Sequence, residues 1–586
     1  MIKFKSFIYI TLSVAGVLLS SCEKFLDKQE EDLLTIDQVF QNRISNQGYL
    51  ANVYNYVPNF IDPKTSFTPV SDEGDFVWSD VRAQQINIGN WSPTNIPIDQ
   101  FAQFYRGIRS ATIYLNRGKE CTECEQQIPG ITTRYVAEAR ALRAYFYFLL
   151  LRQYGPIPII TEVLPVDAKV SDLQLPRNSF DEVVTYIVAE LDKAMIDLPV
   201  QHSPADYGRM DKRTCLAIIS RTLLYSASPL WNGNTDYANF KNKDGKVLVN
   251  QTYDQNKWKL AANRSKELID LMPNGLYKKT VNGVWDPKES YQYLSIDRWN
   301  QEIIFARNFE ANGWEHHMAP RQVGGWNGGG VTQEMVDAYR MSNGMQIDES
   351  GSGYVEEGFS AQAGKYTPKG IWNMWTNREP RFYASVTYNG ANWIWSAQNI
   401  KIQLYGKGAS GFAGSHDHTN TGYLLHRFVS PTSDVQNWNG SPQHDIHFRL
   451  GEIYLNYAEA LNEVSPGNAD ITKYVNLIRE RGGIPNLPIG LGQSEMRELI
   501  RRERRVELAF ESHRVWDTRR WKIAEQTDGG PKTGMNIGEG TSFTDLSFYK
   551  RTVFETRVFQ KKHYLWPIPQ GEIERNKELV QNPDWN

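Results

Sequence analysis

Residues 132–160 read TTRYVAEARALRAYFYFLLLRQYGPIPII, and this stretch decides the fold. Ala137, Ala141 and Ala144 recur at i, i+4 and i+7, so they clear one helical face on which another helix can pack closely. The four aromatic residues at 145–148 follow one another without a gap and therefore point to every side of that helix. Burial on more than one face predicts a central helix in a helical protein.

The helix is expected to end at Gly155, because glycine adopts the left-handed conformation of a helix C-terminus without steric cost. Pro156 and Pro158 then prevent its continuation. Apolar residues at helical spacing predict further helices. The central helix covers residues 132–154, and the further helices are predicted at 35–56, 101–118, 180–198, 212–228, 258–272, 450–461 and around 474–478. Helices that follow one another in hairpins favour tetratricopeptide-like stacking, although the repeat period of roughly 34 residues is not kept.

Composition divides the chain into three parts. Residues 273–447 hold about half of the 44 glycines and 17 tryptophans, with little helical periodicity, which predicts a loop-rich insertion region. Residues 35–272 form the predicted N-terminal helical region, and residues 448–586 the C-terminal one. Short alternating runs at 382–388 and 392–395 predict small strands. Loops displayed on a rigid scaffold are where binding usually occurs.

The N-terminus is typical of a targeting segment. Its apolar run at 7–19 is shorter than the ~20 residues of a spanning helix, so we expect residues 1–21 to be a signal peptide. Leu19-Ser20-Ser21-Cys22 resembles the lipobox of bacterial lipoproteins, whose cysteine is acylated, for example with palmitate. Residues 22–34 would then form a tether behind lipidated Cys22; an ordinary secretory signal with an incidental cysteine is the alternative.

The remaining cysteines do not build the fold. Cys121 and Cys124 have C-x-x-C spacing, but no second pair completes a four-ligand zinc site. A disulfide in a surface loop or free thiols are both compatible with this spacing. Cys215 stands alone.

Nothing in the sequence indicates catalysis or nucleic-acid binding. The net charge is only −3, and there is no Gly-x-Ser-x-Gly elbow, P-loop or His-Glu-x-x-His motif. Glutamates on predicted helices lie beside arginines, which favours structural ion pairs over a pair of catalytic carboxylates. The metal candidates are histidine clusters in loops, where polar clusters are common: 316–317, 416–418 and 444–447. We expect no metal and no cofactor; a calcium ion bound by loop oxygens would leave no readable pattern.

Several blocks carry a resemblance to one family. They are AEAR at 137–140 with the YGPIP that ends the central helix, LGEIYLNYAEA at 450–460, VNLIRER at 475–481, ERRVELAFE at 503–511 and YLWPIP at 564–569. In content and order they resemble the SusD/RagB family of outer-membrane nutrient-binding lipoproteins. The match departs from the family pattern only at the tail, at Lys577 and at residues 584–586.

The resemblance implies a mainly α fold, a tetratricopeptide-like right-handed helical array with large loop-rich insertions and few short strands. It also implies a non-catalytic lipoprotein of the outer membrane, anchored through Cys22 and facing the exterior. Such a protein takes part in polysaccharide utilisation and nutrient uptake, capturing a glycan and delivering it to a SusC-like TonB-dependent transporter.

Aromatic residues in loops are the expected glycan-binding groups, because a sugar ring has apolar faces that stack on an indole and a polar rim that needs hydrogen bonds. The resemblance places the ligand face in two regions without fixing residues. Our candidates in those regions are Asp72, Trp78, Arg82, Trp91, Trp299, Trp314, Trp326, Asn327, Trp372 and Trp375. Peptide capture, as in the RagB branch, is the alternative function; a surface glycoside hydrolase and a helical-repeat scaffold are less favoured.

Overall fold

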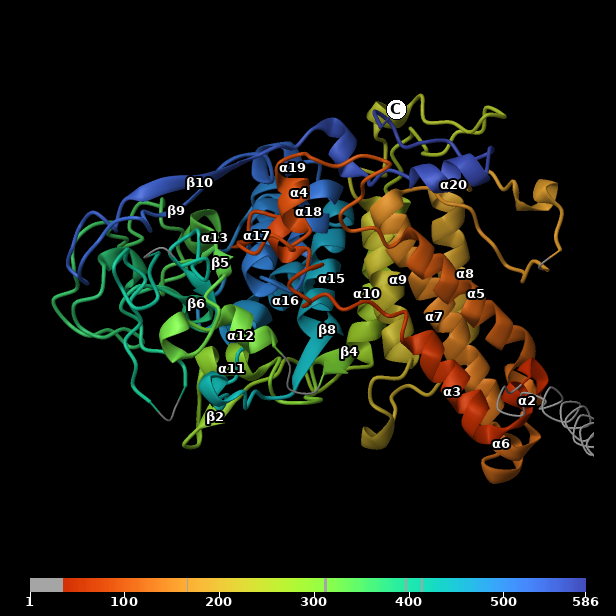
Figure 1. The fold of residues 1–586 in the computed structure, drawn as a ribbon, viewed down its shortest axis with the longest axis horizontal. Coiled ribbons are helices and arrows are strands. Elements are labelled where there is room, and N and C mark those ends of the chain that lie inside the picture. Colours follow the sequence, from red (N-terminus) through yellow and green to blue (C-terminus); the bar gives the residue numbers. More distant parts are fainter. Residues whose placement is uncertain (1–34, 166, 310–312, 396–397, 413–414, 586) are drawn as a thin grey trace, which may run out of the picture.

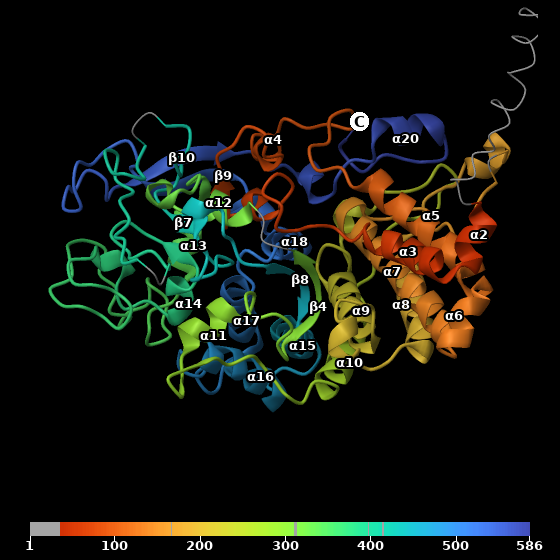
Figure 2. The same ribbon diagram turned by 60° about the horizontal axis from the view of Figure 1, so that its bottom comes forward.

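A series of packed helices forms one side of the molecule, and a loop-rich part forms the other (Figures 1 and 2). The computed structural model describes residues 35–165, 167–309, 313–395, 398–412 and 415–585. Neighbouring helices in the series are α5 (Phe101–Arg117), α7 (Ile131–Tyr154), α8 (Phe180–Asp197), α9 (Lys212–Ala227), α10 (Asn256–Asp270), α15 (Leu450–Val464), α16 (Ala469–Arg481) and α17 (Gln493–Glu507). Because α10 packs on α15, the N-terminal and C-terminal helical regions form one continuous array.

The predicted central helix is confirmed. Helix α7 is buried along almost its whole length, and aromatic residues at 145–148 are each 1 % exposed or less. Gly155 has a φ of 72°, and its backbone N–H donates to the carbonyl oxygen of Leu151 at 2.9 Å. The helix therefore ends at the predicted residue, although the ψ of −143° places Gly155 outside the expected left-handed helical region.

The second helix pair shows how local sequence sets the element boundaries. Ser179 Oγ accepts the N–H of Glu182 at 3.3 Å, and Glu182 accepts the N–H of Ser179 at 2.7 Å, so the two residues form a capping box at the start of α8. The single helix predicted at 35–56 is wrong in one respect. It is divided at Asn42, whose side chain accepts the N–H of Ser45 and so starts a new helix.

The remaining helices are short or flank the array. They are α2 (Ile36–Gln41), α3 (Arg43–Tyr54), α4 (Ala83–Asn87), α6 (Thr122–Gln127), α11 (Pro287–Tyr293), α12 (Trp314–Met318), α13 (Gln333–Ala338), α14 (Pro380–Tyr383), α18 (Arg514–Arg520), α19 (Ala524–Thr527) and α20 (Gln570–Arg575). Within the described ranges, no helix has the length and apolar character needed to cross a membrane.

The strands pair only in twos, all antiparallel. The pairs are β1 (Gly74–Phe76) with β5 (Gly329–Val331), β2 (Thr280–Val281) with β3 (Val284–Trp285), β4 (Ile303–Phe309) with β8 (Gln443–Arg449), β6 (Val386–Thr387) with β7 (Leu424–Leu425), and β9 (Gly530–Met535) with β10 (Arg551–Arg557). The strand expected at 382–388 is mostly wrong, because Pro380 starts the short helix α14 and only two residues remain for β6. Of the run at 392–395, only Asn392 forms an isolated bridge, with Lys401.

A buried cluster of charged side chains joins the helical array to the loop-rich part. The Arg449 guanidinium lies 2.9 Å from the carboxylate of Glu302 and 2.7 Å from that of Glu507. Glu507 also pairs with Arg381 at 3.1 Å and with Arg481. Each of these five side chains is 1 % exposed or less, so the cluster is an internal junction between segments far apart in sequence.

Other helix glutamates are paired with arginines as predicted. The partners are Glu138 with Arg209, Glu452 with Arg221, Glu459 with Arg520 and Glu503 with Arg381. These carboxylates are buried and neutralised by guanidinium groups, so they serve the fold.

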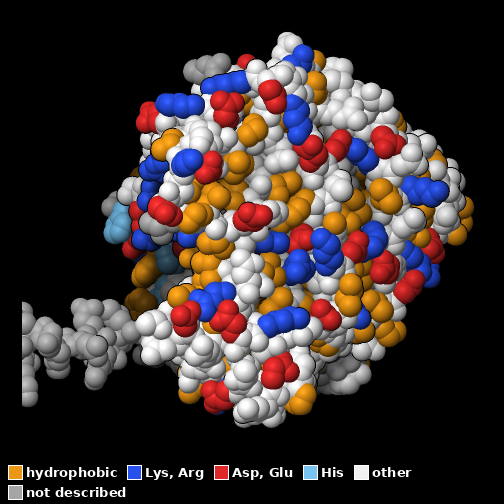
Figure 3. Space-filling view, turned by 90° about the vertical axis from the view of Figure 1, so that its right-hand side faces the viewer, with side chains coloured by type: hydrophobic (Ala, Val, Ile, Leu, Met, Phe, Trp, Pro, Cys, Tyr) orange, Lys and Arg blue, Asp and Glu red, His pale blue; other side chains and the backbone are white. Residues whose placement is uncertain are grey.

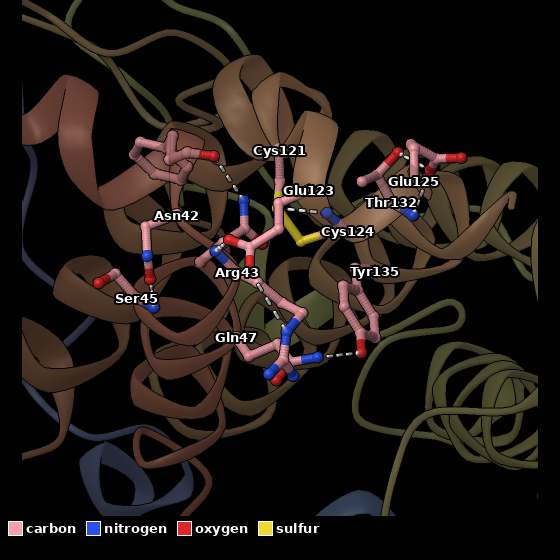
Figure 4. Close-up of a disulfide and its surroundings, with 12 residues drawn as sticks. Asn42, Arg43, Ser45, Gln47, Cys121, Glu123, Cys124, Glu125, Thr132 and Tyr135 are labelled. Atoms are coloured by element: carbon pink, nitrogen blue, oxygen red, sulfur yellow. Dashed lines mark hydrogen bonds and ion pairs between the residues drawn. A yellow bond between two sulfur atoms is a disulfide. The ribbon is translucent and has the colours of Figure 1, made fainter. Parts of the chain in front are cut away.

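Cys121 and Cys124 form a disulfide at the start of α6 (Figure 4). Both residues are buried, which differs from the surface position expected from the sequence. Beside them, Glu123 accepts the backbone N–H of Arg43 at 2.9 Å, and this contact holds α3 against the disulfide-bonded turn. Cys215 is a buried free thiol.

The last residues of the chain close over the end of the central helix. Asn582 donates to the carbonyl oxygens of Tyr154 and Trp566 at 2.9 and 2.6 Å. Trp585 donates its indole N–H to Leu565 and packs against Trp91, with ring centroids 4.6 Å apart. These contacts define a C-terminal seal that covers the end of α7.

Candidate functional site

Four of the tryptophans expected as glycan platforms are part of the core. Trp91, Trp314, Trp372 and Trp375 are 5 % exposed or less, so none presents a ring face to a ligand at the surface. Their expected role as exposed platforms is therefore wrong in this structure. Each is buried by aromatic partners that are distant in sequence.

The partners of these indoles explain their burial. Trp372 stacks on Tyr549 with ring centroids 4.4 Å apart. Trp375 donates its indole N–H to the Tyr423 hydroxyl at 3.1 Å. Trp314 packs edge-on against Phe76, and Trp91 belongs to the C-terminal seal.

Asp72 is also a structural residue, although it was expected in the glycan site. It is 3 % exposed and accepts two hydrogen bonds from Arg514 and one from Arg505, at 2.8 to 3.0 Å. Burial would raise the pKa of Asp72, but these two guanidinium groups outweigh it and hold the pKa below its ordinary value. The carboxylate is therefore ionised and fully engaged, with no role left at the surface.

Trp299 lies elsewhere, in a polar cavity of about 460 Å³ between the loop before α9 and the start of β4. Its ring packs against those of Tyr207 and His444, with centroids 5.2 and 5.4 Å away. The structure therefore does not bring Trp299 together with the other expected residues.

The remaining two indoles, Trp78 and Trp326, lie on one partly exposed aromatic surface. The His317 ring lies between them, with its centroid 4.8 Å from that of Trp78 and 4.5 Å from that of Trp326. Next to Trp326, His316 stacks almost parallel on Trp438 at 3.7 Å. We call these five residues the indole surface.

Trp438 is the residue that sequence reasoning missed. It is 67 % exposed, the most exposed tryptophan in the described part of the chain, and its centroid lies 6.0 Å from that of Trp326. A local signal was present in the sequence, because Trp438 stands among the polar residues Gln436, Asn437 and Asn439. A tryptophan flanked only by polar residues is more readily explained by a surface position than by a core one.

The turn that carries Trp438 is fixed by its own side chains. Asp434 accepts hydrogen bonds from the backbone and the side chain of Asn437, at 3.3 and 2.7 Å. Trp438 itself has a φ of 55°, and Asp434 pairs with Asn439 to close the turn. The indole is therefore held by a short, hydrogen-bonded turn and lies flat on His316.

Glycines under the indole surface let its segments approach closely. A Cβ at Gly328 would lie 2.3 Å from the ring of Trp78, and a Cβ at Gly324 would lie 2.8 Å from the backbone of Gln436. Only glycine fits where Trp78 rests on the chain at 328. Asn327 is buried and donates to the Ser410 carbonyl at 2.8 Å, so it positions this loop and does not face a ligand.

Electrostatically, the indole surface is close to neutral. Burial lowers the pKa of both His316 and His317, so their imidazoles are uncharged at neutral pH. At the edge, Lys64 and Asp80 form an exposed ion pair at 2.7 Å, and Arg82 is exposed nearby in sequence. An uncharged aromatic surface with charged and polar groups at its edge suits a ligand with apolar faces and a hydroxylated rim.

The histidines are used as packing and hydrogen-bonding groups. His447 forms a hydrogen bond with the Tyr145 hydroxyl at 2.7 Å, and His444 forms one with the Asn308 side chain at the same distance. Across the described ranges, no group of three or more His, Cys, Asp or Glu residues is placed to hold a metal ion.

Comparison with known proteins assigns these features to a family. A model described as "SusD family" matches residues 284–585, and a model described as "Starch-binding associating with outer membrane" matches residues 24–224. SusD-like protein P25 of Formosa agariphila is 22 % identical over 97 % of this chain and 96 % of its own length.

Two solved structures share the fold. The protein called BT4246 superimposes with a TM-score of 0.81 at 27 % identity, covering 92 % of this chain and 99 % of the other. A SusD-like carbohydrate-binding protein from Bacteroides fragilis superimposes with a TM-score of 0.71 at 20 % identity, covering 92 % of this chain and all of the other. The expected mainly helical SusD-like fold with few short strands is thereby confirmed, and the strands pair in two-stranded sheets.

Proposed function

The chain belongs to the SusD family, and from this membership and its indole surface we propose that it captures glycans at the cell surface. Members of this family bind ligands without catalysing a reaction, so the chain is a binding protein and not an enzyme. A relative with this fold is named as carbohydrate-binding, which supports a sugar ligand. The observation that carries the proposal is the exposed Trp438, stacked on His316 beside Trp326.

The geometry favours a sugar chain that lies along the surface. Trp438 and Trp326 meet at 67°, so they form two walls of an open angle that can contact successive rings. Trp78 continues the aromatic surface on the other side of His317. The exposed Lys64–Asp80 pair at the edge, where Asp80 is close enough to His317 to interact electrostatically, provides a donor and an acceptor for a hydroxylated rim.

We further propose that captured glycan is delivered to a SusC-like TonB-dependent transporter of the outer membrane. The matched family description, which names association with the outer membrane, supports this location. The predicted acylated Cys22 lies outside the described residues; as an anchor it would keep the protein beside the transporter. A tether of this kind raises the effective ligand concentration at the pore, so weak binding at the indole surface is sufficient.

Affinity electrophoresis on gels that contain purified polysaccharides tests the proposal. We expect at least one neutral polysaccharide to retard the protein, and Trp438→Ala to weaken that retention. Trp438 is 67 % exposed, which for a side chain of about 200 Å² leaves roughly 130 Å² open to solvent. About half of this area, roughly 65 Å², belongs to the ring face that a ligand would cover. Burial of that face contributes about 1.5–2 kcal/mol to binding, so its loss should raise Kd roughly 10- to 30-fold.

Tyr253→Ala is the matched control, since Tyr253 is 55 % exposed and lies before α10, outside the indole surface. Its retention should equal that of the wild type. Retention of Trp438→Ala within twofold of the wild type on every retarding polysaccharide would reject the indole surface as the binding site.

A further inference from the structure

A second cavity lies in the loop-rich part, enclosed by α11, by α14 with β6, and by the loop at 391–394. Its volume is about 440 Å³, within the roughly 300–1,000 Å³ of small-molecule sites. The indole surface contributes no residue to it. Its aromatic walls come from Tyr293, Tyr366, Tyr383, Tyr388 and Trp393.

The aromatic walls are supplied by segments that are distant in sequence. Tyr366 and Tyr383 lie against each other at 5.2 Å with a tilt of 40°, and Trp393 meets His426 edge-on at 6.3 Å. Tyr383 and Trp393 are 7 % and 5 % exposed and therefore fixed by packing, whereas Tyr366 is only partly buried. Rigid apolar walls with one more accessible ring are suited to a flat, ring-shaped ligand.

An unused hydrogen-bond donor lines this cavity. Gln292 is 1 % exposed, and its side-chain oxygen lies 3.4 Å from the ammonium nitrogen of Lys288. Its amide nitrogen has no hydrogen-bond partner among the residues that the structure describes. A buried donor of this kind is costly unless a ligand or a water supplies an acceptor oxygen.

The other polar groups at the cavity carry no net charge. Lys288 pairs with Glu289 at 2.9 Å, so their charges cancel at the edge. His426 is paired at both nitrogens, with Thr387 at 2.8 Å and with the Tyr383 carbonyl at 3.2 Å. Burial lowers the pKa of His426 to about 3, so its imidazole is neutral at neutral pH.

We propose that this cavity is a second carbohydrate site, which takes one neutral sugar ring or the end of a glycan chain. Aromatic walls match the apolar faces of a sugar, and the Gln292 amide and the Lys288–Glu289 pair match its hydroxyl groups. A purely apolar ligand would leave the Gln292 donor unpaired, and a charged ligand would find no net countercharge. The site is separate from the indole surface and goes beyond its proposed function, so either one can fail without the other.

The test uses saturation-transfer NMR on the full chain that carries Trp438→Ala, so that the indole surface is weakened. The probes are glucose, galactose, mannose, xylose and N-acetylglucosamine, with glucuronate and N-acetyltyrosinamide as charged and peptide-like comparisons. We expect transfer to at least one neutral sugar and weaker transfer to glucuronate.

Two further changes connect the signal to the cavity. Gln292→Leu keeps the volume and removes the donor, and Tyr366→Ala removes a partly exposed wall; each should weaken sugar binding by about fivefold or more. Gln526→Leu, at an exposed glutamine in α19, is the control and should leave binding unchanged. A thermal melt of each variant shows that it is folded.

Three results would overturn the proposal. They are the absence of transfer to every neutral sugar in the Trp438→Ala chain, transfer that is unchanged in both cavity variants, and transfer to N-acetyltyrosinamide alone. The last result would assign the cavity to a peptide side chain. If glycan retention at the indole surface fails while these sugar signals persist, only the proposed function of the indole surface is lost.

Discussion

Glu507→Gln should measurably destabilise the protein, because it removes one negative charge from the buried junction between the helical array and the loop-rich part. The Glu507 carboxylate faces the guanidinium groups of Arg381, Arg449 and Arg481, all of them buried. Burial alone would raise the pKa of Glu507, but the three arginines outweigh burial and lower the pKa from 4.5 to about 2.

The size of the effect follows from this lowered pKa. A decrease of this extent corresponds to about 3 kcal/mol of stability at neutral pH, close to the roughly 3–5 kcal/mol lost when one partner of a buried ion pair is removed. For a folded unit of roughly 550 residues, an unfolding entropy of about 2.1 cal/mol/K per residue converts this loss of free energy into a decrease in Tm of about 2.5–3 °C.

The pH dependence has a defined sign. Because the pKa of Glu507 is lower in the folded chain, its stabilisation is complete above about pH 4.5 and is lost as the pH falls through about 2. Differential scanning calorimetry should therefore show the full Tm difference between wild type and Glu507→Gln at pH 7 and about half of it at pH 3.

Glu480→Gln is the matched control, because Glu480 is 53 % exposed and pairs with the exposed Lys278. Its Tm should stay within about 1 °C of the wild type. A Glu507→Gln chain that also melts within 1 °C of the wild type at pH 7 would show that the junction does not stabilise the fold as argued.

Two further substitutions separate packing from binding. Trp91→Ala removes a core indole and should lower the free energy of unfolding by about 3–5 kcal/mol and Tm by about 3–4 °C. The folded variant should keep its glycan retention. An unchanged Tm would contradict the position of Trp91 in the C-terminal seal. Gly328→Ala places a methyl group 2.3 Å from the Trp78 ring and should displace it, weakening retention in affinity electrophoresis. Gly538→Ala, where a Cβ meets open space, should leave retention unchanged, and equal retention by the two alanine variants would remove Trp78 from the indole surface.

The helical scaffold could be predicted from sequence because periodicity reports which faces of a helix are buried. The predicted helices at 132–154 and 180–198 differ from α7 and α8 by one residue at an end. The break at Asn42 was missed, because the apolar pattern continues through a capping residue that starts a new helix.

The glycan site could not be predicted residue by residue, because a loop has no period that reports burial. Trp372 and Trp438 stand in similarly irregular segments, yet Tyr549 covers the first and the second is 67 % exposed. Which of them is covered depends on residues far along the chain. The composition therefore predicted a role for aromatic rings of this region in binding, and only the three-dimensional contacts show which rings are exposed to a ligand.

The C-terminal seal has a consequence for biosynthesis. Because Asn582 and Trp585 complete the surroundings of Tyr154 and Trp91, the centre of the molecule lacks part of its covering until residue 585 has been made. Until these residues have been made, the growing polypeptide would leave Tyr154 and Trp91 incompletely buried, and this part of the fold would stay loosely structured. Removal of residues 582–585 by a protease would likewise uncover the end of α7 and the Trp91 indole.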